Sequence, residues 1–302
     1  MKKRVVFMGS ADFSSIIMES LANDERFEVA ALFTQPDKPV GRKQIMTPPD
    51  TTICAKRFNI PTFQPQKISE CTEQISKLKP DFIVVAAYGQ ILRGDILSIA
   101  PCINLHTSFL PKNRGAAALQ THILENDDYA GVTAIRMDKG LDTGDILGTV
   151  FFRPDGCVKF SCLLKHLGYQ AANLTKSVIT EFAMLKPLKQ INADASYAKK
   201  LSKEDGLIDF TSAKKAYKKF LAYYPWPGIY LESGLKIKEG SFCEFDSKNT
   251  PGEIIEITED FVKIGFLKGS LLFSRLQAPS KNEVSAVEYI RGKRLNVGDI
   301  LV

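Results

Sequence analysis

An asparagine, a histidine and an aspartate are spaced in this chain so that they could stabilise an oxyanion and move a proton. Asn104 and His106 alternate with Leu105 at the end of the apolar segment 102–105. A strand has a period of two, so both polar side chains fall on one face. Asp142 has a glycine two positions away on either side, so its loop can approach another segment closely. Polar groups gathered where strands end are the usual ligand position of open sheets. We therefore predict a catalytic site here, in preference to a surface loop whose histidine caps a turn.

The elements that must position these residues follow a βαβ pattern over the first 185 residues. The segment 82–87 is apolar throughout, which is typical of a central parallel strand covered on both faces. Residues 1–187 are therefore predicted to form a Rossmann-like α/β domain with a mostly parallel sheet. Gly168 is a candidate kink in its last helix. Strands are expected over 4–8, 27–33, 82–87, 102–105, 131–137 and 147–152, and helices over 13–22, 51–58, 72–77, 116–125 and 159–185.

A smaller second domain is predicted after Pro187. Residues 188–207 are polar and lysine-rich, which indicates a linker. Residues 212–223 have apolar side chains at helical spacing, and short segments broken by turn residues follow. This pattern favours an antiparallel β-barrel of the oligonucleotide-binding (OB) type over 208–302.

Composition narrows the class of protein. The 302 residues suggest one large or two ordinary domains, and the net charge of +6 is a weak hint of an acidic partner. We expect no membrane span, because no run of about 18 apolar residues occurs. Six cysteines without a CxxC pair and three histidines favour neither a disulfide framework nor a metal site, which fits a reducing cytoplasm. The absence of G-x-G-x-x-G and Walker motifs argues against a nucleotide cofactor.

Two segments carry a resemblance to a known family. NLHTSFLPKNRG at 104–115 and MDKGLDTGD at 137–145 are similar to the signature of the folate-dependent formyltransferases. Members of this family transfer a formyl group from 10-formyltetrahydrofolate to an amine. FMGSADF at 7–13, TQPDKPVGR at 34–42 and YPWP at 224–227 resemble the members that act on transfer RNA. The resemblance implies that a monomeric chain formylates the α-amino group of initiator methionyl-tRNA.

The resemblance also implies the residues of the site. Its catalytic residues are Asn104, His106 and Asp142. The segment after the central strand resembles the one whose backbone holds the pterin ring of the folate. From the residues alone, a strand-to-helix turn explains that segment equally well. The implied folate contacts are Tyr88, Gly89, Gln90, Ile91, Leu92, Ser108, Leu110, Pro111, Asp138 and Gly140.

The chain departs from the family pattern without losing a catalytic group. Lys112 stands where an arginine is common, which weakens a bidentate phosphate contact there. The other departures are Arg93, Thr107, Asn113 and Ala118.

The expected chemistry is direct attack of the amine on the bound formyl group. There is no G-x-S-x-G motif and no cysteine in the signature, so no acyl-enzyme nucleophile is evident. Asn104 is predicted to donate to the tetrahedral oxyanion, and His106 to support that charge and relay the proton. Asp142 is predicted to orient His106, through water, and to accept the proton.

Two groups of basic residues are expected to contact transfer RNA. Arg42, with Lys38 and Lys43, lies in a loop rich in proline and glycine, and the resemblance implies that it contacts the acceptor end. Lysine and arginine suit phosphate contacts because neutralising phosphates releases counterions. For both groups, the alternative to a transfer-RNA contact is a basic surface that is only solvated. The second group is the polar face of the predicted helix, Lys214, Lys215, Lys218 and Lys219.

Two other functions remain open from the sequence. A formyltransferase acting on an amino-sugar nucleotide could share the first domain, but the TQPDKPVGR loop and the basic second domain argue against it. A noncatalytic RNA-binding protein could use the barrel, but it would not need the intact Asn104, His106 and Asp142.

Overall fold

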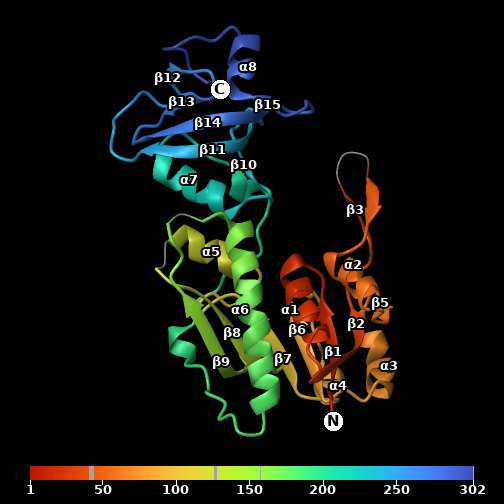
Figure 1. Cartoon of the computed structure of the whole chain (residues 1–302). Helices are drawn as coiled ribbons and strands as arrows, with labels where there is room; N and C mark the ends of the chain where they lie inside the picture. The colour runs from red at the N-terminus through yellow and green to blue at the C-terminus, as the bar shows by residue number, and fades with distance from the viewer. Residues whose placement is uncertain (41–43, 126–127, 157, 302) are drawn as a thin grey trace. The chain divides into compact units, whose positions relative to one another are not determined.

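The computed structural model describes residues 1–40, 44–125, 128–156 and 158–301. The chain forms two compact units (Figure 1). The first comprises Met1–His122, Asp127–Asp155 and Cys162–Lys199, and the second comprises Ile123–Asn126, Gly156–Ser161 and Lys200–Val302. Of the predicted linker, residues 188–199 thus belong to the first unit and residues 200–207 to the second. In the described part of the chain, no helix has the length and apolar character needed to cross a bilayer.

A seven-stranded sheet in the order β5-β2-β1-β6-β7-β8-β9 forms the centre of the first unit. The strands from β5 to β7 pair in parallel, and β8 and β9 are antiparallel, so the predicted mostly parallel sheet is confirmed. The central strand β6 is buried along its whole length, as its apolar sequence predicts. The strands are β1 (Lys3–Gly9), β2 (Phe27–Phe33), β5 (Thr62–Phe63), β6 (Phe82–Ala86), β7 (Cys102–His106), β8 (Ala130–Arg136) and β9 (Asp145–Phe152).

Helices cover both faces of this sheet. On one face, α1 (Asp12–Ala22) and α6 (Phe160–Glu181) pack so closely that a Cβ on Gly168 would lie 2.9 Å from Ile16 Cδ1. This contact explains the glycine. The opposite face packs its alternate side chains against η1 (Ile68–Cys71), α3 (Thr72–Lys77) and α4 (Gly94–Leu97). Other helices of the unit are α2 (Asp50–Arg57), η2 (Asn192–Asp194) and α5 (Ala118–Glu125); the last residues of α5 belong to the second unit.

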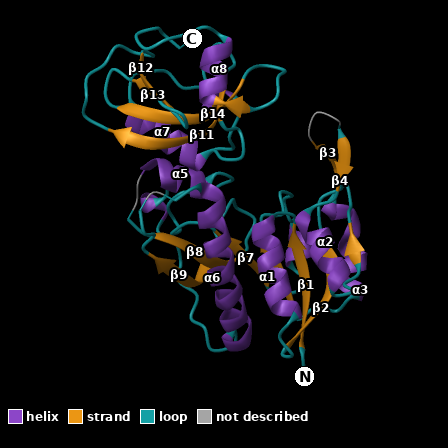
Figure 2. Cartoon of the chain, turned by 45° about the horizontal axis from the view of Figure 1, so that its top comes forward, coloured by secondary structure: helices purple, strands orange, loops and turns teal. Residues whose placement is uncertain are grey.

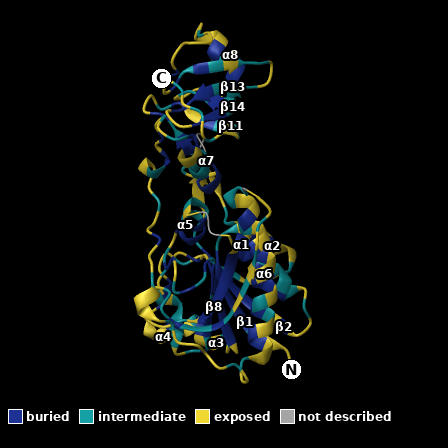
Figure 3. Ribbon diagram, turned by 90° about the vertical axis from the view of Figure 1, so that its left-hand side faces the viewer, coloured by how far each residue is buried: buried dark blue, intermediate teal, exposed yellow. Residues whose placement is uncertain are grey.

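The second unit is an antiparallel sheet in the order β10-β11-β14-β13-β12, with β15 on β14. Among its described residues no hydrogen-bonded ladder joins β10 to β12. The predicted amphipathic helix is α7 (Ala213–Ala222), which buries Ala213, Ala216 and Phe220 against the sheet. Figure 2 shows the strands of this sheet in orange, and Figure 3 shows its buried residues in dark blue. The strands are β10 (Ile229–Tyr230), β11 (Lys236–Glu244), β12 (Ile254–Ile257), β13 (Val262–Gly265), β14 (Ser270–Gln277) and β15 (Val284–Ser285).

Several elements were not predicted, among them the short strands β5 and β15. A hairpin of β3 (Lys38–Val40) and β4 (Ile45–Thr47) replaces part of an expected loop, and its exposed residues leave no pattern of burial to detect. The short helix α4 follows Arg93. Helix α8 (Ala286–Gly292) begins with a capping box of Ser285 and Glu288, a signal that the sequence does contain.

Candidate active site

The structure brings Asn104, His106 and Asp142 together at the end of β7. Asn104 Nδ2 donates to Asp142 Oδ1 at 3.3 Å. His106 Nδ1 lies 3.6 Å from Asp142 Oδ2, and these two side chains are only 9% and 13% exposed. The histidine and the aspartate thus face each other at a distance longer than a hydrogen bond, and the water between them stays a prediction. The three polar groups form one partly buried cluster in which electrostatic interactions are stronger than in water.

Two acceptors hold the imidazole of His106. Its Nε2 lies 2.9 Å from the carbonyl oxygen of Asn113, and its Nδ1 faces the carboxylate. A carbonyl oxygen only accepts, so Nε2 carries a proton in this arrangement. Asn113 is itself fixed, because its backbone N–H donates to Ser196 Oγ at 2.9 Å and its side chain accepts from the same hydroxyl. The ring plane is thus set by the backbone of the loop as well as by Asp142.

Asp142 is fixed by more partners than the sequence indicates. Gly115 N donates to Asp142 Oδ2 at 2.8 Å. Its backbone lies in the left-handed region, with φ 53°, which an aspartate tolerates better than most residues. Gln190 Nε2 donates to the carbonyl oxygens of Asp142 and Gly144 at 2.8 and 2.7 Å. The loop that presents the carboxylate is therefore held at both its side chain and its backbone.

A buried arginine supports this arrangement from behind. Arg114 is 2% exposed, and its guanidinium donates to Gln190 Oε1 and to Asn192 Oδ1. Neither Gln190 nor Asn192 was predicted as a site residue, since both lie in the segment that was expected to be a linker. No local sequence signal marks them, because their role depends on how residues 188–199 return to the first unit.

The segment expected to hold the folate follows β6 on the same face as His106. Tyr88 and Leu92 are buried there, while Ile91 is 84% exposed. Gln90 already pairs its amide with Ile68 N and Pro65 O, and Gln35 Nε2 donates to Tyr88 O at 3.0 Å. Burial raises the pKa of the Tyr88 phenol far above its ordinary value, and its hydroxyl has no hydrogen-bond partner among the residues that the structure describes.

The other expected folate contacts organise their own loops in this structure. Ser108 Oγ donates to Lys112 O at 2.7 Å, and Leu110 N donates to Thr133 Oγ1 at 3.3 Å. Pro111 follows Leu110 through a cis peptide bond. Asp138 Oδ1 accepts from Gly140 N at 2.9 Å and from Thr143 Oγ1 at 2.6 Å, which closes the turn that contains Asp142. The polar atoms of Ser108 and Asp138 are thus engaged within the protein.

The basic residues expected to bind transfer RNA have different surroundings. Lys38 is exposed on β3, whereas Arg42 and Lys43 lie outside the described residues. On α7, Lys214 and Lys215 are exposed, and the ammonium of Lys214 lies over the ring of Phe245. The other two lysines of that face donate to backbone carbonyls, Lys218 to Leu124 and Lys219 to Leu207.

Among the residues that the structure describes, no group of three or more histidine, cysteine, aspartate or glutamate side chains could hold a metal ion.

Comparison with known proteins identifies the family of the chain. Residues 2–150 match the model of the formyl transferase family, and residues 200–294 match that of the formyl transferase C-terminal domain. The methionyl-tRNA formyltransferase of Nitratiruptor sp. is 48% identical over 300 residues, which cover 98% of this chain and 99% of the relative.

Two solved structures share the fold at low sequence identity. The methionyl-tRNA formyltransferase from Clostridium thermocellum has a TM-score of 0.57 at 16% identity, covering 80% of this chain and 94% of that one. HypX from Aquifex aeolicus, in complex with tetrahydrofolic acid, has a TM-score of 0.69 at 15% identity. The match covers 96% of this chain but only 47% of HypX.

Proposed function

This chain belongs to the formyl transferase family, and we propose that it transfers the formyl group of 10-formyltetrahydrofolate to the α-amino group of methionyl-tRNA. The relative that is 48% identical along the whole chain is named for this acceptor. The observation that carries the proposal is the contact of Asn104, His106 and Asp142 at the end of β7. Gathering three such groups in one partly buried cluster costs desolvation free energy, which a catalytic role explains.

The reaction begins with attack of the neutral amine on the formyl carbon. A free α-amino group has a pKa of about 7.7–8.0, so a sizeable neutral fraction exists near neutral pH. The carbon–nitrogen bond forms as the carbonyl electrons move to oxygen. The second Nδ2 proton of Asn104 is available to the oxyanion, since one is directed to Asp142.

Proton transfer completes the exchange. Asp142 accepts the proton released by the attacking nitrogen. The imidazole of His106, which lies between Asp142 and the Asn113 carbonyl, supports the negative charge of the oxyanion. The tetrahedral intermediate then expels the N10 nitrogen of the folate, which takes up the proton that Asp142 accepted and so restores the carboxylate. No group of the enzyme is acylated in this sequence, and positioning supplies most of the lowering of the barrier.

The donor site is proposed on the β6 side of the cluster. Tyr88, Gly89, Gln90, Ile91 and Leu92 follow β6, and that strand is the parallel neighbour of β7. Backbone donors and acceptors in an apolar slot suit the edge of a flat heteroaromatic ring. Ser108, Leu110, Pro111, Asp138 and Gly140 remain proposed contacts, acting through backbone atoms or apolar surface where their side chains are already paired.

We propose that Arg42 and its neighbours, with Lys214 and Lys215, contact the phosphates of the initiator transfer RNA. The three catalytic residues and their supports come from one unit of one chain, which is consistent with a monomer. The cytoplasm is the proposed compartment, and the described cysteines, all free, are compatible with it.

The test is a transfer assay with the purified chain. It is given 10-formyltetrahydrofolate labelled in the formyl group, together with methionyl-tRNA in one reaction and an amino-sugar nucleotide in another. Formylmethionine in the first reaction and no product in the second is the expected result. Label on the amino sugar alone would make the chain a formyltransferase of amino-sugar nucleotides. No label on either acceptor would favour a noncatalytic RNA-binding role.

A further inference from the structure

Three aromatic side chains gather beside the catalytic cluster and have no role in the reaction as described. Phe109 and Tyr129 each meet the edge of Phe151, with ring centroids 6.1 and 5.9 Å apart. Tyr129 is 47% exposed and Phe151 is 63% exposed. We call Phe109, Tyr129 and Phe151 the aromatic patch.

The strand register places this patch on the same face of the sheet as His106. His106 pairs with Thr133, and Gly131 pairs with Phe151. Paired residues share a face, and so do residues two apart on a strand, which puts Gly131 and Phe151 on the face of His106. A Cβ on Gly131 would lie 2.7 Å from the Phe109 ring, so the glycine makes room for that ring.

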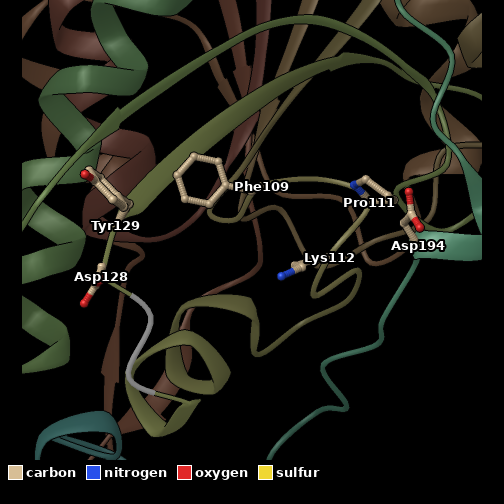
Figure 4. A pocket seen from close by; sticks show the side chains of 6 residues that line it. All are labelled: Phe109, Pro111, Lys112, Asp128, Tyr129 and Asp194. Carbon is tan, nitrogen blue, oxygen red and sulfur yellow. The ribbon is translucent and has the colours of Figure 1, made fainter.

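Helix α6 does not cover the patch. It contacts the other face of β9, where Leu174 lies against Gly148 and His166 against Phe152. Beside the patch is an open depression of about 690 Å³. Figure 4 shows Tyr129 and Asp128 at one side, Pro111 and Asp194 at the other, and Phe109 and Lys112 between them. A volume of this size is typical of sites for molecules larger than an amino-acid side chain.

The chemistry of the depression fits unpaired nucleotides. Aromatic rings stack on bases, because every base has a π face. Asp128 and Asp194 can accept hydrogen bonds from the exocyclic amines of cytosine and adenine and from ribose hydroxyls. Lys112 supplies a point charge for a phosphate.

The order of the strands leaves the β8–β9 side of the catalytic cluster for the acceptor. β6, which leads into the proposed donor segment, flanks β7 on one side, and β8 and β9 flank it on the other. β8 and β9 run antiparallel, so the start of β8 and the end of β9 lie at the edge of the sheet where β7 ends. Gly131 is two residues along β8 from the partner of His106, which is about 7 Å.

We propose that the aromatic patch and the depression beside it bind the unpaired 3′-terminal nucleotides of the aminoacylated transfer RNA, and so direct the aminoacyl ester to His106. This inference rests on the proposed function, since it names the part of the acceptor that the site holds. Transfer RNAs end in the single-stranded sequence CCA, whose three bases all carry exocyclic amines.

The first experiment removes the rings and keeps apolar bulk. In Tyr129→Leu and Phe151→Leu, KM for methionyl-tRNA rises by about 5- to 150-fold, the range expected for loss of one stacked base. KM for the formyl donor stays at the parent value. Tyr129→Phe keeps the ring and retains most of the affinity. Tyr169→Leu is the matched control, because Tyr169 is a 54% exposed tyrosine on α6.

The second experiment measures binding without catalysis. The trinucleotide CpCpA is titrated into the full chain by calorimetry, with UpUpU for comparison. The parent binds CpCpA more tightly, and Tyr129→Leu and Phe151→Leu each weaken that binding by a similar factor to the rise in KM. Asp128→Asn together with Asp194→Asn reduces the preference for CpCpA over UpUpU.

The two failures are distinguishable. A parent chain that formylates methionyl-tRNA, with variants unchanged in both KM and CpCpA binding, would overturn the inference and leave the proposed function standing. A rise in KM for the formyl donor would also overturn the inference, because it would show that the aromatic patch binds the folate. The variants could instead lose discrimination between methionyl-tRNA and other aminoacyl-tRNAs while CpCpA binding stays intact. That result would overturn the inference, because the patch would then bind the amino-acid side chain. If the parent binds CpCpA through the patch but transfers no formyl group, the site stands and the proposed function fails.

Discussion

At the scale of single residues, the placement of Asp142 depends on groups that are distant in sequence. Its carboxylate accepts from Asn104 and Gly115 and faces His106, while Gln190 holds its backbone carbonyl. A carboxylate with this many partners is preorganised, so the site needs little rearrangement when charge develops in the transition state. The alternation of Asn104 and His106 could be predicted from the sequence. The support from Arg114 and Gln190 could not, because it comes from tertiary contacts.

We expect each catalytic side chain to be essential for turnover. Asn104→Ala removes one oxyanion donor, which typically lowers the rate about 100- to 1000-fold. Asp142→Asn keeps the shape but removes the proton acceptor, with an expected loss of about 100- to 10,000-fold, and His106→Ala should fall in the same range. Single-turnover rates are measured beside circular dichroism and folate titration. A folded variant that binds folate and turns over near the parent rate would remove that residue from the mechanism.

Gln190 is predicted to be a positioning residue. Gln190→Leu removes both donated hydrogen bonds to the Asp142 loop and leaves the Arg114 guanidinium with one fewer acceptor, at about 1–3 kcal/mol for each buried group left unpaired. The expected result is a lower kcat with an unchanged KM for the donor. Gln170→Leu, at an exposed position of α6, is the matched control. A stability loss with unchanged kcat would show that Gln190 only holds the fold.

At the scale of elements, patterns of burial decided which strands and helices could be predicted. β6 and α7 have apolar residues at the spacing of their structure, and both were predicted nearly to their ends. The β3–β4 hairpin is exposed on both strands, so no alternation marks it. Helix α8 could have been predicted from its capping box, but it is short and lies among stronger strand signals.

Gly168 provides a test of packing at this scale. Gly168→Leu is expected to destabilise the first unit by about 1–3 kcal/mol, because a side chain there would overlap Ile16 of α1. Chemical denaturation of the full chain measures the change. Gln170→Leu adds the same side chain to an exposed position of the same helix and should leave the midpoint nearly unchanged. Equal effects of the two variants would contradict the close packing of α1 and α6.

At the scale of the whole molecule, the second unit carries the lysines that we propose contact the transfer RNA. The sequence presents four lysines on one helical face, and the structure separates them into two pairs. Lys218 and Lys219 donate to backbone carbonyls, whereas Lys214 and Lys215 are exposed. The sequence could not make this distinction, because it depends on carbonyls contributed by other segments.

The exposed pair should account for more of the salt dependence of binding. Lys214→Gln with Lys215→Gln is expected to reduce the slope of log affinity for transfer RNA against log salt by about 0.7–0.9 for each phosphate that is no longer neutralised. Lys218→Gln with Lys219→Gln serves as the comparison and should change the slope less. If the comparison pair reduces the slope more, the contact surface has been misplaced, and if neither pair changes it, this helix does not meet the phosphates.

Direct transfer of the formyl group at the Asn104, His106 and Asp142 cluster is the central claim, and rapid-quench kinetics with labelled donor test it most directly. Enzyme in excess is mixed with 10-formyltetrahydrofolate and methionyl-tRNA, and protein, folate and RNA are separated at each time. We predict that label leaves the folate and appears on methionyl-tRNA in one matched phase, slowed in Asp142→Asn. Label that passes first to the protein, or a phase unchanged in that variant, would contradict the account.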